Sequence, residues 1–296
     1  MTAEMLGPLR HPIHRFVLGE VEITSILDGA IEMGISPPFL LDESDTVTAA
    51  IARAANLPTD KLENNFVPVL LNVGGTLVLI DTGFGQFGRD KGAGLLRGRL
   101  SDAGYKPEDI DIVALTHAHP DHIGGIWEGE DLAFPNAQLM IGRREFDAWK
   151  SDDGIPEQRA QNREMFLKIV APLEDRFRFL EHGDEIAPGV TTEAAFGHSP
   201  GHLMFRVESG GHQALIWADV ANHYVFSVGH PNSKVGFDDD KKMAIATRTR
   251  LLAEAADSGV LVVGHHMPFP AVGYVERTAE AYRWVPATYQ LRMLGG

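Results

Sequence analysis

Thr-His-Ala-His-Pro-Asp-His-Ile-Gly-Gly, residues 116–125, is the most informative stretch of this chain. It places His117, His119, Asp121 and His122 within six residues of one another. Imidazole nitrogens and carboxylate oxygens are ligands that suit divalent transition metals, zinc first among them. Four such neighbours crowd a single tetrahedral ion, so the stretch predicts two metal ions that share one loop. The remaining ligands must then come from elsewhere in the chain.

Three later segments repeat the organisation of this first one. The apolar run 112–115 predicts a short buried strand that leads directly into the histidine cluster. In the same way, residues 196–202, 216–219 and 262–270 each place a His or an Asp at or just after an apolar run. Strand ends that meet at one edge of a sheet would bring these side chains together on a rigid support. The sequence therefore predicts a single site that is built from four strand ends.

The rest of the chain alternates between strand-like and helix-like patterns. Period-two or continuous apolar runs predict strands, and runs with a spacing near 3.6 predict helices. The predicted helices are residues 44–56, 95–103, 143–150, 157–170 and 239–257. This order predicts an α+β fold in which two sheets pack face to face with helices outside. We expect one domain over residues 1–296, made of two similar αβ halves, with the helix over 157–170 covering the site.

The composition excludes several classes of protein. The chain has 296 residues, of which 44% are hydrophobic, and a formal net charge of −15. It contains no cysteine, so metal ligands must be His, Asp or Glu. The acidic balance argues against a nucleic-acid partner. The absence of an apolar signal region or of a long apolar run predicts a cytoplasmic protein without a membrane partner.

Taken together, these motifs resemble the metallo-β-lactamase superfamily. The resemblance rests on His-x-His-x-Asp-His at 117–122, Asp-Thr-Gly at 81–83, Gly-His-Ser-Pro-Gly-His at 197–202, the lone Asp219 and a late His. It runs from about residue 15 to the C-terminus and implies the four-layer αββα sandwich of that superfamily.

Two further segments narrow the resemblance. Residues 264–270, Gly-His-His-Met-Pro-Phe-Pro, and residues 237–240 with Thr247 and Arg248, resemble the methyl parathion hydrolase-like branch. That branch is close to the N-acyl-homoserine lactone hydrolases. The resemblance also implies a homodimer.

The resemblance implies two divalent metal ions, with Zn²⁺ expected and Fe, Mn or Co as alternatives. It assigns His117, His119 and His198 to the first metal, Asp121, His122 and His266 to the second, and Asp219 to both together with a bridging hydroxide. The pattern of this branch favours His198 over His202 and His266 over His265 as ligands. Asp81, His202 and His265 are then expected beside the ligands, where Asp81 orients the histidine loop.

The function implied is hydrolysis of a small ester, most simply a lactone, by a metal-bridging hydroxide, with Asp121 steering the proton. A phosphotriester hydrolase is the alternative on the same site. A single-iron sulfur dioxygenase and a non-catalytic metal-binding protein are further alternative hypotheses. The small-molecule substrate is expected to meet His223, Tyr224 and Phe269, which follow predicted ligands.

Two neighbouring features have simpler interpretations. The acidic run 238–240 is expected to cap the helix that follows it and to form its first turn. Trp149 is expected either in the substrate pocket or in the core.

Overall fold

The computed structural model describes residues 3–287 and 291–293 of the chain. Its first large sheet contains β1 (Ile13–Leu18), β2 (Val21–Ile26), β5 (Val69–Val73), β6 (Thr76–Ile80), β7 (Ile112–Leu115), β10 (Gln138–Gly142), β11 (Phe177–Leu180) and β19 (Arg292–Met293). Across this sheet the strands follow the order β11-β10-β7-β6-β5-β2-β1-β19.

The second large sheet comes from the later part of the chain. It contains β12 (Glu185–Ala187), β13 (Val190–Ala194), β14 (Leu203–Ser209), β15 (His212–Ala218), β16 (Leu261–Gly264), β17 (Val272–Arg277) and β18 (Tyr282–Pro286), side by side in that order. Two smaller sheets pair β3 (Gly29–Gly34) with β4 (Lys61–Phe66) and β8 (Trp127–Glu128) with β9 (Asp131–Leu132).

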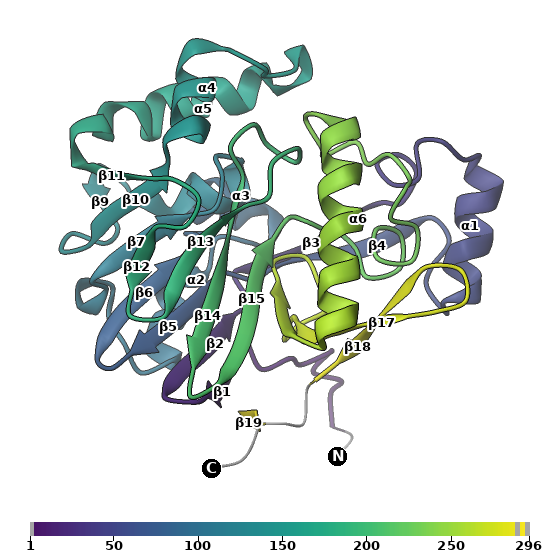
Figure 1. Cartoon of the computed structure of the whole chain (residues 1–296), viewed down its shortest axis with the longest axis horizontal. Helices are drawn as coiled ribbons and strands as arrows, with labels where there is room; N and C mark the ends of the chain where they lie inside the picture. Colours follow the sequence, from purple (N-terminus) through teal and green to yellow (C-terminus); the bar gives the residue numbers. More distant parts are fainter. Residues whose placement is uncertain (1–2, 288–290, 294–296) are drawn as a thin grey trace.

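The helices are α1 (Asp45–Ala54), α2 (Leu96–Asp102), α3 (Pro120–Ile123), α4 (Arg143–Ser151), α5 (Ala160–Ile169) and α6 (Lys241–Ser258). Figure 1 shows α4 and α5 together at the top of the molecule, with α6 running alongside the second sheet.

The alternation of side chains along the strands explains why the two sheets pack together. In β5, Leu71 points into the core between the sheets, whereas its neighbour Leu70 points to the helices outside. Phe205 and Ile216 of the second sheet lie in the same central core as Leu71. Since successive strand residues point to opposite faces, strands that are apolar on both faces must be covered on both.

Helices cover the two outer faces. Leu96 of α2, Phe146 of α4 and Phe166 of α5 pack on the outside of the first sheet. Leu251 and Leu252 of α6 pack on the outside of the second. The layers are therefore helix, sheet, sheet and helix, which confirms the predicted α+β fold and its αββα sandwich. The internal similarity of the two halves remains a prediction.

Strand direction places the predicted ligands at one edge. Strands β6, β7, β10 and β11 run parallel to one another, and β15 runs parallel to β16. Parallel neighbours end on the same side, so the residues that follow β6 and β7 lie close together, as do those that follow β15 and β16. This edge carries the histidine cluster.

The predicted helices all have counterparts in the structure. Ser44 caps α1, since its side chain accepts a hydrogen bond from the amide of Val47. The sequence did not predict β4, whose pairing with β3 forms a hairpin beside the site. Residues 273–291 have a strand-like sequence pattern, and the structure forms β17 and β18 there up to Pro286, whereas residues 288–290 lie outside the described part.

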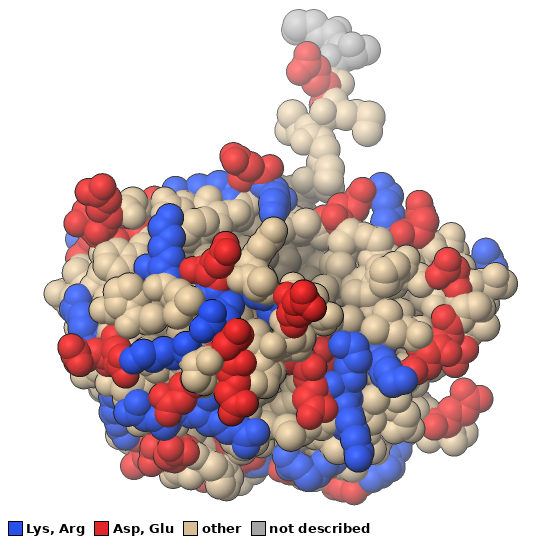
Figure 2. Space-filling view, turned by 90° about the horizontal axis from the view of Figure 1, so that it is seen from above, with Lys and Arg blue, Asp and Glu red and all other residues tan. Residues whose placement is uncertain are grey.

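The charge and hydropathy of the folded chain bear on the partners that it can have. None of the helices in the described residues is long and apolar enough to cross a membrane. On the face seen in Figure 2, acidic and basic side chains alternate without a continuous basic patch. The absence of a nucleic-acid partner and the cytoplasmic location remain predictions.

Candidate metal centre

The histidine loop is held in place by Asp81 and Thr82, which follow β6. Asp81 Oδ1 accepts a hydrogen bond from the amide of Thr116 at 2.8 Å, and its Oδ2 lies 2.8 Å from His122 Nδ1. The Thr82 side chain donates to the carbonyl of His122 at 2.8 Å. Asp81 has a φ of 63°, which a non-glycine residue adopts at a cost. The loop thus depends on this buried carboxylate, in the position expected for a residue that orients the loop.

Three imidazole rings converge on one point. His119 Nδ1 lies 3.0 Å from His117 Nε2 and 2.9 Å from His198 Nε2. Each ring has an oxygen at its other nitrogen: Thr116 Oγ1 for His117, Asp239 Oδ2 for His119 and Asp238 Oδ1 for His198. Those oxygens fix the N–H on the outer side of each ring, so the three inner nitrogens present lone pairs to one another.

A second group of side chains lies beside the first. His122 Nε2 is 3.5 Å from Asp121 Oδ2, and His266 Nε2 is 3.4 Å from the same oxygen. His266 Nδ1 lies 2.9 Å from the backbone carbonyl of Asn65, which leaves Nε2 directed at the carboxylates. This group and the three rings contain all the ligands expected from the sequence except Asp219.

Asp219 lies between the two groups. Its carboxylate oxygens are 3.2 Å from His198 Nε2, 3.3 Å from His122 Nε2 and 2.9 Å from His266 Nε2. Burial acts to raise the pKa of Asp219, but His266, His122 and His198 outweigh it and hold the pKa well below its usual value. The buried carboxylate is therefore ionised.

The donor set fits divalent metal ions. Three facing lone pairs about 3 Å apart repel one another unless a cation lies among them. His122 Nε2 and Asp219 Oδ1 are buried and have no hydrogen-bond partner among the described residues. Nitrogen and carboxylate oxygen in this arrangement are the ligand types of zinc and its neighbours. The residues present thus match two adjacent cation sites.

Two adjacent aspartates support two of the three rings, which corrects the expected role of the acidic run. Only Asp240 caps α6, through a hydrogen bond from the amide of Met243. Asp238 instead holds His198 and pairs with the buried Arg248 at 3.1 Å. Asp239 holds His119. The sequence pattern indicated only a helix cap. It could not predict that Asp238 and Asp239 bind the imidazole rings, because only the tertiary fold brings the start of α6 against those rings.

Asp238→Asn should weaken zinc binding by roughly 10–100-fold, since the residue orients a ring that faces the metal. Asp240→Asn is the matched control, because Asn caps a helix as well as Asp does. Zinc affinity is measured by competition with a chromophoric chelator. Equal affinities in the two variants would show that Asp238 does not position His198.

A buried glutamate ties two ligand loops together and was not anticipated from the sequence. Glu145, at the start of α4, accepts hydrogen bonds from the amides of Ala118 at 2.8 Å and Gly201 at 2.7 Å. It also accepts from Trp149 Nε1 at 2.8 Å and from the Ser199 hydroxyl. Trp149 is therefore part of the core. A lone Glu at a helix start carries no sequence signal for this role.

Glu145→Ala should lower the free energy of unfolding by roughly 3 kcal/mol or more, because it leaves several buried donors without a partner. The exposed Glu164 of α5 provides the control, and Glu164→Ala should change stability by less than about 0.5 kcal/mol. Chemical denaturation measures both. Similar midpoints and slopes for the two variants would contradict the bridging role of Glu145.

His202 and His265 occupy different environments beside the ligands. His202 Nδ1 donates to the carbonyl of Ala195 at 3.0 Å, and its Nε2 accepts from the amide of Asp219 at 3.3 Å. Both of its nitrogens are thus committed to the backbone. His265 Nε2 is buried without a hydrogen-bond partner among the described residues, and its ring lies 4.1 Å from that of His122. It could join Asp121, His122 and His266 around one ion.

A cavity of about 300 Å³ opens onto this cluster. Five residues of the cluster line it, namely His119, Asp121, His198, Asp219 and His266. Its remaining lining is largely apolar, with a few polar side chains: Ile31, Met33, Asn64, Phe66, Phe84, Pro120, Arg159, Asn162 and Phe237.

The predicted pocket residues are not among those that line this cavity. His223 is buried, and its Nδ1 accepts from the amides of Val225 and Phe226. Tyr224 stacks on His223, and Phe269 packs against the core under α6. The cavity wall comes instead from the β3–β4 hairpin, which the sequence did not predict, and from α5, which lies within the helix that the sequence predicted over 157–170 as a cover of the site.

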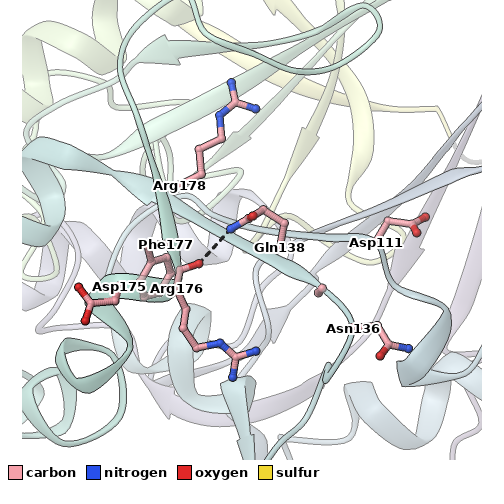
Figure 3. Close-up of a pocket in the computed structure, with 8 residues that line it drawn as sticks. Asp111, Asn136, Gln138, Asp175, Arg176, Phe177 and Arg178 are labelled. Carbon is pink, nitrogen blue, oxygen red and sulfur yellow. Dashed lines mark hydrogen bonds between the residues drawn. The ribbon is translucent and has the colours of Figure 1, made fainter.

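A second hollow lies at the other end of the strands. It is lined by polar residues that include Asp111, Gln138 and Arg176, and Gln138 donates to the carbonyl of Arg176 at 2.9 Å (Figure 3). Asp111 precedes β7 and Gln138 begins β10, whereas the histidine cluster follows the end of β7. The two sites therefore lie at opposite edges of the sheet.

Comparison with known proteins agrees with this geometry. The sequence profile described as the metallo-beta-lactamase superfamily matches residues 68–265, about two thirds of the chain. The chain belongs to the metallo-β-lactamase superfamily. Its matched region includes most of the cluster, from Asp81 through Asp219 to His265.

Among curated members of the superfamily, an N-acyl homoserine lactonase of Bacillus cereus is 34% identical over 110 residues, which cover 37% of this chain and 38% of that protein. One from Bacillus sp. is 31% identical over 152 residues, 51% of this chain and 54% of that protein. The matches thus span about half the length of these relatives or less.

Solved structures of the superfamily match over nearly the whole chain. AidC, a dizinc quorum-quenching lactonase in complex with a product, superposes with a TM-score of 0.88 at 27% identity, covering 94% of this chain and 98% of AidC. The hydrolase AbOPH superposes with a TM-score of 0.85 at 26% identity, covering 96% of this chain and 100% of AbOPH.

Proposed function

We propose that this chain is a dinuclear metal-dependent hydrolase that opens the ring of an N-acyl homoserine lactone. The observation that carries the proposal is the pair of ligand groups, joined by Asp219, that line part of a largely apolar cavity. The relatives that are named lactonases, and the dizinc centre of AidC, support the same chemistry.

The metal ligands follow from which atoms face each other. We assign His117, His119 and His198 to one ion, Asp121, His122 and His266 to the other, and Asp219 to both. We prefer His266 to His265, because His266 Nε2 lies 2.9 Å from Asp219 and its Nδ1 faces a backbone carbonyl. Such an outer hydrogen bond fixes the tautomer that leaves the inner nitrogen to bind metal. Zinc suits this set best.

Two divalent ions at this position would polarise the lactone carbonyl and supply a hydroxide at neutral pH. The residues of the chain would exclude water from the site and transfer the proton. The largely apolar wall excludes bulk water around the bound ester, which strengthens the electrostatic interactions of the site.

Asp121 is the carboxylate best placed to handle protons. The Asp121 side chain lines the cavity and is 14% exposed, whereas that of Asp219 is 3% exposed. Burial acts to raise the pKa of Asp121, but His122 and His266 keep it well below the usual value, so the carboxylate is ionised at neutral pH. When water adds to the carbonyl carbon and the ring C–O bond breaks, Asp121 transfers the proton from the water to the leaving ring oxygen. The product is a hydroxy acid.

A substrate panel with the zinc-loaded protein tests the proposal. The panel contains N-hexanoyl-L-homoserine lactone, an aryl ester and a phosphotriester, alongside elemental analysis for Zn, Fe, Mn and Co. Lactone hydrolysis that needs two metal ions per chain is the expected result. Preference for the phosphotriester, or a single iron that consumes O₂, would overturn it.

A further inference from the structure

Helix α5 presents two polar side chains to the cavity that the metal cluster does not use. Arg159 immediately precedes α5, and Asn162 lies three residues later, in its first turn. Residues three apart lie on the same face of a helix, and both line the cavity. The other lining residues outside the cluster are mostly apolar, so these two side chains, together with Asn64 of β4, are the polar groups that a ligand would meet there.

Arg159 is held rigidly, with one nitrogen to spare. Its Nε donates to Asp239 Oδ1 at 2.8 Å, and its Nη2 donates to the carbonyl of Phe237. Nη1 makes no hydrogen bond within the described residues, and the side chain keeps 15% of its surface exposed. The ion pair with Asp239 orients the guanidinium before any ligand arrives, which reduces the entropic cost of using its remaining donor.

Asn162 is uncommitted altogether. Its side-chain amide makes no hydrogen bond within the part of the chain that the structure describes, although the residue is partly buried. A primary amide offers both a donor and an acceptor. It therefore complements a secondary amide of a ligand, which has one N–H to donate and one carbonyl oxygen to accept.

The other walls complete the match to an acylated amine. Met33 and Phe66 of the β3–β4 hairpin, with Phe84 and Phe237, offer apolar surface for a hydrocarbon chain. Such a ligand reacts at the metal cluster and lays its acyl chain along this apolar surface. The amide that connects its ring to the chain must then lie between the metal cluster and the apolar surface.

We propose that Asn162 and Arg159 bind the amide of the substrate and so make the enzyme selective for lactones that bear an acylamino group. Asn162 pairs with the amide, and Arg159 Nη1 donates to its carbonyl oxygen. A substrate without the amide covers these polar groups and leaves them unpaired, which is how buried polar sites reject analogues. This inference rests on the proposed lactonase activity, which it makes more specific.

The test compares two lactones, N-hexanoyl-L-homoserine lactone and a γ-lactone with an alkyl chain of similar length but no amide. The quantity measured is the ratio of their kcat/KM values. Asn162→Leu should lower this ratio about tenfold, mainly through KM of the amide substrate. The adjacent and exposed Gln161 supplies the control, since Gln161→Leu should leave the ratio as it is.

Arg159→Lys tests the second residue. Lysine keeps the positive charge beside Asp239 but lacks the second guanidinium nitrogen. We expect two bound metal ions, as in the unaltered protein, and a lower ratio. An unaltered ratio in both Asn162→Leu and Arg159→Lys would overturn the inference while leaving the lactonase proposal intact.

A binding measurement separates this inference from the proposed function. The ring-opened product N-hexanoyl-L-homoserine keeps the amide and is titrated into the zinc-loaded protein by calorimetry. Asn162→Leu should weaken its binding about tenfold, relative to Gln161→Leu. If neither lactone is hydrolysed, the activity proposal fails. In that case a weakened Kd still supports amide binding by Asn162, and equal Kd values in the two variants overturn it.

Discussion

Asp219→Ala should abolish both metal binding at full stoichiometry and hydrolysis. The carboxylate lies within 3.3 Å of nitrogens from both ligand groups. Its removal leaves several buried imidazoles without the negative charge that draws cations to them. We expect fewer than two metal ions per chain by elemental analysis, and a fall in kcat/KM of roughly 1,000-fold or more, since several kcal/mol of transition-state stabilisation is lost.

Asp257→Ala is the matched control for this variant. Asp257 is an exposed aspartate at the end of α6 that pairs with Arg277 at 2.7 Å. Its loss should alter neither metal content nor rate, because exposed ion pairs contribute little. Retention of two metal ions by Asp219→Ala would contradict the shared position of this carboxylate.

His198→Ala should be far more damaging than His202→Ala, although both residues belong to one short motif. His198 Nε2 faces His119 and Asp219, whereas both nitrogens of His202 are occupied by backbone groups. Loss of His198 removes an inner nitrogen from the three-ring group. We expect roughly a 100-fold or greater loss of zinc affinity, with activity falling in parallel.

His202→Ala should keep two metal ions but lower stability. It leaves the carbonyl of Ala195 and the amide of Asp219 without their partner, at a cost of about 1–3 kcal/mol. Zinc titration and thermal unfolding distinguish the two variants. If His202→Ala lost zinc as readily as His198→Ala, the assignment of ligands in this motif would be wrong.

Local motifs carried most of what the sequence predicted correctly. The apolar runs gave the strands, and the residues that follow them gave the positions where His117, Asp219 and His266 would meet. Such signals are local because a strand and the first residues after it are neighbours in the chain. Strands that are apolar on both faces also require two covered sheets, so the layered fold could be anticipated.

The surroundings of the cluster were harder to predict. The sequence around Asp238 and Asp239 predicted only a helix cap, and no sequence pattern pointed to Glu145. In the structure all three residues hold ligand loops or rings. Each acts on a residue 27 or more positions away in the chain. Side chains that act over such separations show no periodicity or spacing, since only the folded chain brings the partners together.

The residues that line the cavity were likewise hard to predict from local sequence. Its expected residues followed Asp219 and His266 in sequence, but the structure turns His223 and Phe269 into packed positions. The hairpin of β3 and β4 and the start of α5 fill that place instead. The sequence by itself determined the sandwich and the type and spacing of the metal-binding side chains, because those depend on strand pattern and local chemistry. Only the tertiary structure decided that the β3–β4 hairpin joins the helix predicted over 157–170 in enclosing the cavity, because a cavity wall is made by packing between segments that share no local pattern.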